Sequence, residues 1–161
     1  MSTIVSVGLG ELAVSDRQTD VIKTYGLGSC IAVVIYDRTR SLGGLLHVVY
    51  PESSVDPRRA NDQPGYFADT GVPLLLKKMG LPGTTNRRNV LVRLTGGANM
   101  MDAEGRFNIG KRNLLAVKRE LWKAGLGVGG EDAGGTISRT AWIDVKSGEL
   151  TVANGSRTWN L

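Results

Sequence analysis

Short apolar runs fill the first 50 residues and predict a series of β-strands. The strongest run, residues 31–36, consists mainly of β-branched and aromatic side chains, which favour strands. Residues 37–43 then supply turn-forming side chains, and residues 44–50 return as a second apolar run. This order predicts a β-hairpin. Three weaker runs come before it and are also expected to be strands: residues 4–8, 12–15 and 21–25.

Apolar residues three or four positions apart predict two helices farther along the chain. The first covers residues 66–79 and is expected to stop at Gly80. Pro73 lies inside it and predicts a kink or a later start, because proline has no backbone N–H. The second and clearer helix is expected to begin after Asn108 and to end at Gly125. Its repeating apolar positions are Ile109, Leu114, Val117, Leu121 and Trp122.

The remaining segments predict further strands and loops. Residues 52–65 are polar and are expected to form an exposed loop. Residues 89–94 form another apolar run, followed by a glycine-containing loop at residues 95–101. The tail alternates at residues 137–145 and again at residues 150–153. The order of elements predicts an α+β fold, with a mixed β-sheet or sandwich core flanked by two main helices.

Length and composition fit one compact unit in a reducing environment. The 161 residues contain no internal repeat and no obvious linker, so residues 1–161 are expected to form a single domain. One cysteine cannot form an internal disulfide, and no secretion signal opens the chain. No apolar run approaches the roughly 20 residues of a membrane span. We therefore expect a cytoplasmic protein without membrane insertion.

The chain carries 20 basic and 15 acidic residues, a net charge of +5. The basic residues occur in scattered pairs, and few aromatic residues lie between them to stack on bases. This distribution indicates a solvated basic face and no nucleic-acid partner. It could raise the rate of encounter with an acidic protein.

Cys30 and His47 are the only cysteine and the only histidine in the chain. The predicted hairpin brings them near each other, and a cysteine beside a histidine is typical of a nucleophile with its base. An imidazolium at this position would lower the pKa of the thiol. Gly28 and Ser29 precede the cysteine, and backbone N–H groups in this loop could hold an oxyanion. A single buried cysteine is more often inert, so the hypothesis depends on all these features together.

A third group that orients the histidine ring would complete such a site. Thr24, six residues before the cysteine, could do so through its hydroxyl. The nearest acidic alternative is Asp37, in the predicted turn of the hairpin.

Two glycine-rich segments and the histidine–cysteine pair invite other interpretations, which the pattern does not favour. Residues 125–130 match a dinucleotide-binding spacing, but they follow a predicted helix where the motif must precede one. Gly96 and Gly97 lack the lysine of a phosphate-binding loop and are expected to form a tight turn near the site. One histidine and one cysteine are too few for a metal site without suitably spaced carboxylates. We expect no metal and no cofactor.

Six segments together make the chain resemble the CheD family, the chemoreceptor glutamine deamidases of bacterial and archaeal chemotaxis. The resemblance covers nearly the whole chain. It implies that Cys30 is the nucleophile, that His47 is the base and that Thr24 completes the site. It also implies a sandwich fold similar to that of the cytotoxic necrotizing factor deamidases. The segments are residues 24–30, 44–51, 64–69, 96–101, 108–113 and 131–135.

The resemblance further implies the reaction and the partners. The substrates would be glutamine side chains on the cytoplasmic helices of chemoreceptors, converted to glutamate with release of ammonia through a Cys30 thioester. Hydrolysis of receptor methyl esters could use the same route, and a CheC-type phosphatase could be a second partner. Two alternatives stay open: a binding module that has kept the fold, and a cysteine protease that cleaves peptides.

Overall fold

The computed structural model describes residues 1–81, 87–100 and 107–161. Within these residues, ten strands form two sheets of five. One sheet contains β1 (Thr3–Val7), β3 (Asp20–Leu27), β8 (Arg139–Asp144), β9 (Leu150–Asn154) and β10 (Arg157–Asn160), in that order. The other contains β2 (Leu12–Ser15), β5 (Leu42–Val48), β4 (Ile31–Asp37), β6 (Val90–Gly96) and β7 (Gly130–Ala133).

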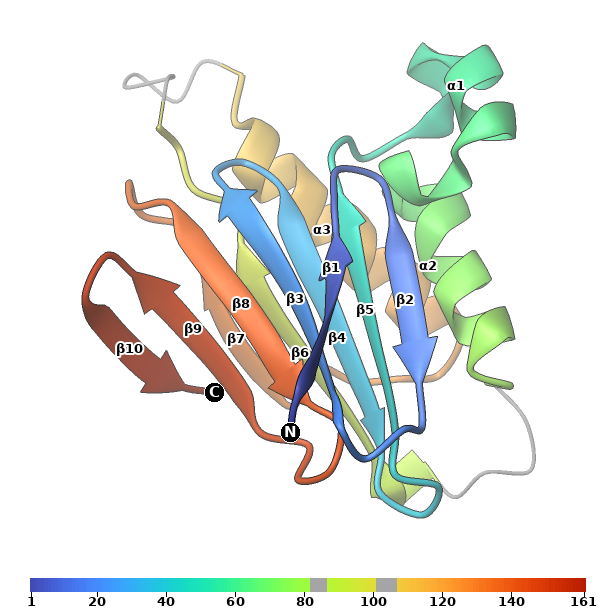
Figure 1. Ribbon diagram of the computed structural model, residues 1–161. Coiled ribbons are helices and arrows are strands. Elements are labelled where there is room, and N and C mark those ends of the chain that lie inside the picture. The colour runs from blue at the N-terminus through green and yellow to red at the C-terminus, as the bar shows by residue number, and fades with distance from the viewer. Residues whose placement is uncertain (82–86, 101–106) are drawn as a thin grey trace.

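The two sheets face each other, and the two longer helices cover the outer face of the second sheet (Figure 1). Every residue of β4 is buried, which explains its almost uninterrupted apolar sequence. Its side chains alternate between two cores. Ile31 and Val33 pack toward the helices, whereas Ala32 and Val34 face the first sheet. The helices and short 3₁₀ turns are η1 (Ser53–Val55), α1 (Pro57–Asp62), η2 (Pro64–Tyr66), α2 (Ala68–Lys78), η3 (Arg87–Asn89) and α3 (Ile109–Lys123).

The expected hairpin is confirmed as the antiparallel pair β4 and β5, with Ala32 opposite His47. Its turn is shorter than expected, because β5 already begins at Leu42. The strand also ends at Val48, before the expected residue 50. Beyond it, the N–H groups of Val49 and Tyr50 donate to the carbonyl of Tyr66 in place of a strand neighbour.

Both main helices are confirmed, with one correction at Pro73. The helix α2 begins at Ala68, two residues after the expected start, and it continues through Pro73, so the proline does not mark its beginning. The helix ends as expected, because Gly80 adopts a left-handed backbone with φ of +71°. At the second helix, Asn108 precedes the first helical residue and Gly125 follows the last turn, also as expected.

One α-helix and two strands of the described residues were not predicted, nor were the short 3₁₀ turns. The segment expected to be an exposed loop contains α1, which Pro57 opens and the Asp56 side chain caps. The strands β7 and β10 have polar sequences without apolar alternation. The loop expected from residue 95 starts later, because Thr95 and Gly96 still belong to β6, and Met101 lies outside the described residues.

The α+β sandwich with two main helices is therefore confirmed. The sheets are mixed, because β1 pairs in parallel with β3 and β6 with β7. The likeness to the cytotoxic necrotizing factor deamidases stays a prediction. In the part of the chain that the structure describes, no helix is long and apolar enough to cross a membrane.

Candidate active site

The residues singled out in the sequence meet at one end of the sandwich, the upper end in Figure 1. The loop from β3 to β4 carries Gly28, Ser29 and Cys30 at this end. The strand β5 finishes beside it, directly after His47. Both sheets contribute, because Thr24 belongs to β3 in the first sheet.

His47 and Thr24 are joined by a buried hydrogen bond between the two sheets. The distance from His47 Nδ1 to Thr24 Oγ1 is 2.7 Å, and the Thr24 hydroxyl also donates to the carbonyl of Val7 at 2.7 Å. A hydroxyl has one proton, and the Val7 carbonyl can only accept. Thr24 must therefore accept from Nδ1–H, which makes Nε2 the nitrogen of neutral His47 with the free lone pair.

Cys30 lies on the same face of the second sheet as His47. The residue opposite His47 is Ala32, and Cys30 comes two positions before it, so the two side chains are diagonal neighbours. Such neighbours are roughly 7 Å apart between Cβ atoms. No hydrogen bond joins them. His47 Nε2 is buried and has no hydrogen-bond partner among the described residues.

Burial keeps both groups uncharged. It raises the pKa of the Cys30 thiol to about 11, an effect only partly offset by the backbone N–H of the same residue. It lowers the pKa of His47 to about 4. The lowered thiol pKa expected from the sequence is therefore wrong for this arrangement, because desolvation outweighs any stabilisation of the ion pair.

The acidic alternative to Thr24 lies away from the site. Asp37 is the last residue of β4, at the end of the strand opposite Cys30. Its carboxylate forms an ion pair with Arg40 at 2.6 Å. It therefore cannot orient the His47 ring.

All three carbonyl groups of the Gly28–Ser29–Cys30 loop are held by donors from other segments. The N–H of Ala98 donates to the Gly28 carbonyl at 2.8 Å, and the N–H of Gly97 donates to the Cys30 carbonyl at 2.8 Å. The side-chain amide of Asn113 donates to the Ser29 carbonyl at 2.9 Å. Among the described residues, no carbonyl accepts from the N–H of Ser29 or Cys30. The Cys30 N–H instead lies near the thiol of its own residue.

Close backbone packing explains the glycines around this loop. A Cβ at Gly96 would lie 2.2 Å from the Cys30 carbonyl oxygen, and one at Gly110 would lie 2.3 Å from the Gly97 oxygen. Gly96 and Gly97 also have positive φ, at +115° and +64°. Gly96 still belongs to β6, so the tight turn that was expected at these two glycines stays a prediction. Any side chain at Gly96 or Gly110 would push the Cys30 loop or α3 away.

Asn113 is the residue that the sequence analysis missed. It is fully buried on α3 and touches the loop that carries Cys30. The only signal in the sequence was a polar residue among the apolar positions of a helix, which does not by itself indicate a site.

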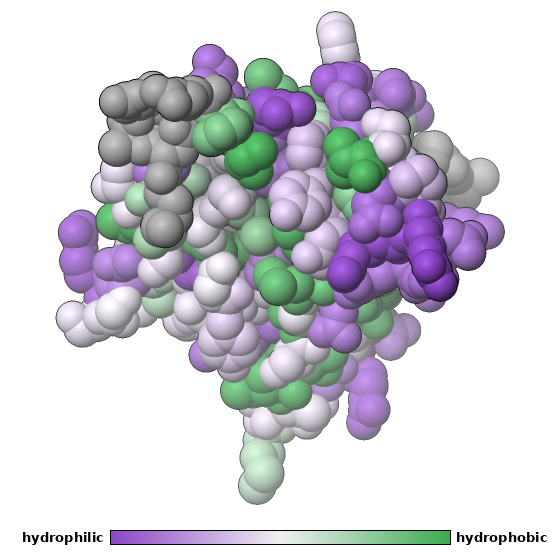
Figure 2. Space-filling view, turned by 90° about the horizontal axis from the view of Figure 1, so that it is seen from above, coloured by the Kyte–Doolittle hydropathy of each residue, from purple (hydrophilic) through white to green (hydrophobic). Residues whose placement is uncertain are grey.

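A groove of about 530 Å³ lies beside the Cys30 loop. Its rim includes the exposed side chains of Met100 and Phe107. Figure 2 looks onto this end of the molecule and shows pale and hydrophobic residues over its middle, with a hydrophilic area on the right. The groove can therefore accept a segment with apolar side chains. Its lining residues are Gly28, Ser29, Ala98, Asn99, Met100, Phe107, Ile109 and Gly110.

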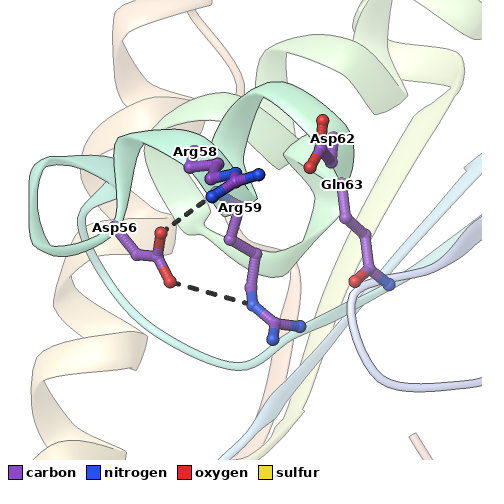
Figure 3. A pocket seen from close by; sticks show the side chains of 5 residues that line it. All are labelled: Asp56, Arg58, Arg59, Asp62 and Gln63. Atoms are coloured by element: carbon purple, nitrogen blue, oxygen red, sulfur yellow. Dashed lines mark hydrogen bonds and ion pairs between the residues drawn. The ribbon is translucent and has the colours of Figure 1, made fainter.

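A second hollow, of about 320 Å³, lies on α1 and is charged (Figure 3). The Arg59 guanidinium is 3.9 Å from the Asp56 carboxylate and stacks over the Tyr66 ring at 4.6 Å. None of the residues that line this hollow belongs to the Cys30 site. Among the described residues, no group of three or more histidine, cysteine or acidic side chains is arranged to hold a metal ion.

Comparison with known proteins assigns the family. The model of the family described as CheD chemotactic sensory transduction matches residues 49–154. A probable chemoreceptor glutamine deamidase CheD of Syntrophotalea carbinolica is 44% identical over 163 residues, covering 100% of both chains. The chain belongs to the CheD family.

Two further CheD relatives, both also named probable chemoreceptor glutamine deamidases, come from distant organisms. The Solibacter usitatus protein is 44% identical and covers 91% of this chain and 86% of its own. The Thermococcus kodakarensis protein is 42% identical and covers 94% of each. Among solved structures, the Bacillus licheniformis hypothetical protein YfiH matches with a TM-score of 0.46 at 14% identity, over 76% of this chain and 49% of its own.

Proposed function

We propose that this CheD protein is a protein-glutamine deamidase of chemoreceptors, with Cys30 as nucleophile, His47 as base and Thr24 as the group that orients the base. The observation that carries the proposal is the hydrogen-bonded chain from Val7 through Thr24 to His47 Nδ1. It leaves the Nε2 lone pair on the face that carries Cys30, where a general base for the thiol is needed.

The first half of the reaction forms a thioester. His47 Nε2 accepts the thiol proton as Cys30 Sγ attacks the carboxamide carbon of glutamine. The N–H groups of Ser29 and Cys30, which donate to no carbonyl of the described residues, hold the oxyanion, and Gly28 shapes the loop. The imidazolium then protonates the departing nitrogen, and ammonia leaves.

In the second half, His47 takes a proton from water, which attacks the thioester and releases glutamate and the free thiol. Because burial favours the neutral form of both side chains, the thiol proton moves during the attack, and no stable ion pair precedes it. Methyl esters of receptor glutamates can enter the same thioester with methanol as the leaving group. We include this side activity in the proposal.

The groove beside the loop supports a helical protein substrate. Its apolar rim, formed by Met100 and Phe107, suits the side chains next to a glutamine on a receptor helix. A CheC-type phosphatase could present a similar helix to the same groove. This activity requires a cytoplasmic location, where the receptor helices are.

The test is incubation of a receptor cytoplasmic fragment with the wild type and with Cys30→Ser, which keeps the size of the side chain. We expect glutamine-to-glutamate conversion and ammonia release with the wild type alone, measured by peptide mass spectrometry and an ammonia assay. Binding without conversion, across several receptors, would favour a regulatory binding module. Cleaved peptides without ammonia would favour a protease.

A further inference from the structure

Asn113 connects three segments that meet at the candidate site. It comes from α3 and is fully buried. Its side-chain nitrogen donates to the Ser29 carbonyl and to the Val49 carbonyl, both at 2.9 Å. Val49 lies two residues after His47. One amide therefore ties the loop before Cys30 to the end of the strand that carries the base.

The bond to Ser29 acts directly on a proposed oxyanion donor. The Ser29 carbonyl and the Cys30 N–H belong to the same planar peptide unit, so fixing one fixes the direction of the other. A donor on the carbonyl also polarises the unit and strengthens its N–H as a donor. The neighbouring carbonyls of Gly28 and Cys30 accept from backbone donors. Among the described residues, Asn113 therefore supplies the one side-chain donor that fixes the direction of this peptide unit.

Packing alone does not account for an asparagine at this position. The helix already contacts the sandwich through apolar residues such as Val117 and Leu121 and through the close approach of Gly110. The oxygen of the Asn113 amide is buried without a hydrogen-bond partner among the described residues, which is unfavourable for folding. An apolar side chain would avoid that cost, but it would leave the Ser29 and Val49 carbonyls without the donor that Asn113 supplies.

We propose that Asn113 is a positioning residue, which aims the Cys30 N–H at the oxyanion of the reaction. The oxyanion itself belongs to the proposed deamidase mechanism. The proposal can be tested without a receptor. Acylation of Cys30 by any ester forms an oxyanion intermediate, whereas alkylation of the same sulfur forms none.

The experiment compares two reactions of Cys30 in the full chain. In the first, p-nitrophenyl acetate acylates the sulfur: a sulfur–carbon bond forms, and the bond to nitrophenolate breaks. In the second, iodoacetamide alkylates the sulfur with loss of iodide. For Asn113→Ala we expect acylation to slow by about tenfold or more, as for a misplaced oxyanion donor, and alkylation to stay within about twofold.

Val117→Ala is the matched control, because it shortens a fully buried side chain of the same helix and removes no hydrogen bond to the loop. It should leave the ratio of the two rates unchanged. Asn113→Leu, of similar size, replaces the alanine variant if that variant does not fold. Three results would overturn the proposal. The Asn113 variant could lose both reactions equally, or it could lose no acylation at all. The wild type could also be acylated no faster than the unfolded chain. If the wild type deamidates no receptor, the proposed function is rejected. The ratio of the acylation rate to the alkylation rate can still be measured in that case.

Discussion

At the scale of single residues, the Thr24 hydroxyl determines where the proton of His47 sits. It donates to Val7 and so can only accept from the ring, which assigns the proton to Nδ1. A hydroxyl can therefore orient a histidine ring as a carboxylate does in catalytic triads, without adding a buried charge.

Thr24→Val removes this hydroxyl and keeps the shape of the side chain. We expect the deamidation rate to fall about 10- to 100-fold, as for a base that has lost its orienting group. The ¹⁵N NMR spectrum offers a direct readout, because His47 is the only histidine. The wild type should show the Nδ1–H tautomer at neutral pH, and the variant a mixture. Thr158→Val, on the exposed strand β10, is the control. An Nε2–H tautomer in the wild type would refute this role of Thr24.

Burial of His47 also makes stability depend on pH. Its pKa falls from 6.5 to about 4 on folding, so below pH 6.5 the unfolded chain binds more protons than the folded protein. Folding stability should therefore drop as the pH falls through this window. From pH 7.5 to 4.5 we expect a loss of about 2 to 3 kcal/mol from this group.

Urea unfolding at the two pH values measures this loss. Because carboxylates also titrate near the lower pH, the comparison uses His47→Gln, which cannot titrate at this position. The wild type should lose more stability than the variant over the same interval. Equal losses would mean that folding does not lower the pKa of His47.

At the scale of elements, α3 reaches the Cys30 loop only because Gly110 has no side chain. A Cβ there would lie 2.3 Å from the carbonyl oxygen of Gly97. That contact is with backbone, which cannot rotate away as a flexible side chain could. The distance between helix and loop, and hence the reach of Asn113, depends on this one glycine.

Gly110→Ala should therefore cost about 1 to 3 kcal/mol of folding stability, the usual penalty of overpacking. It should also slow acylation of Cys30, because α3 moves away from the loop. Urea unfolding and the acylation rate check both effects. Gly127→Ala is the matched control, since a Cβ at Gly127 meets nothing within 4 Å. Equal stability of the two variants would contradict the close packing described here.

Elements with a strong apolar pattern could be predicted from the sequence. Strands that form only because a neighbouring strand offers backbone hydrogen bonds could not. The hairpin of β4 and β5 is almost wholly apolar, so its pattern suffices. The strand β7 has the sequence Gly-Glu-Asp-Ala and exists because β6 lies beside it. In the site, Cys30 and His47 stand out as the only residues of their kinds. Asn113 acts through a loop 84 positions away, which no local pattern encodes.

At the scale of the whole molecule, the site exists only where the two sheets are packed together. Thr24 comes from one sheet, and His47 and Cys30 are attached to the other. Separation of the sheets would break the bond between Thr24 and His47 and expose the buried thiol. Activity and folding should therefore be lost together.

We propose accordingly that residues 1–161 unfold as one domain. Trp142 lies on β8 and Trp159 on β10, both in the first sheet, and Trp122 lies on α3 beside the second sheet, so tryptophan fluorescence reports on the first sheet and on the helix. Its urea transition should coincide with that of far-UV circular dichroism. Two separate transitions would show that the sheets fold independently.

The most direct measurement for the central claim is capture of the thioester on Cys30. The wild type is mixed with a receptor cytoplasmic fragment in the presence of hydroxylamine, which attacks thioesters. Mass spectrometry should then show hydroxamate at the same receptor positions that otherwise become glutamate, and none with Cys30→Ser. Conversion to glutamate that continues in Cys30→Ser, or without any hydroxamate in the wild type, would contradict a Cys30 thioester mechanism.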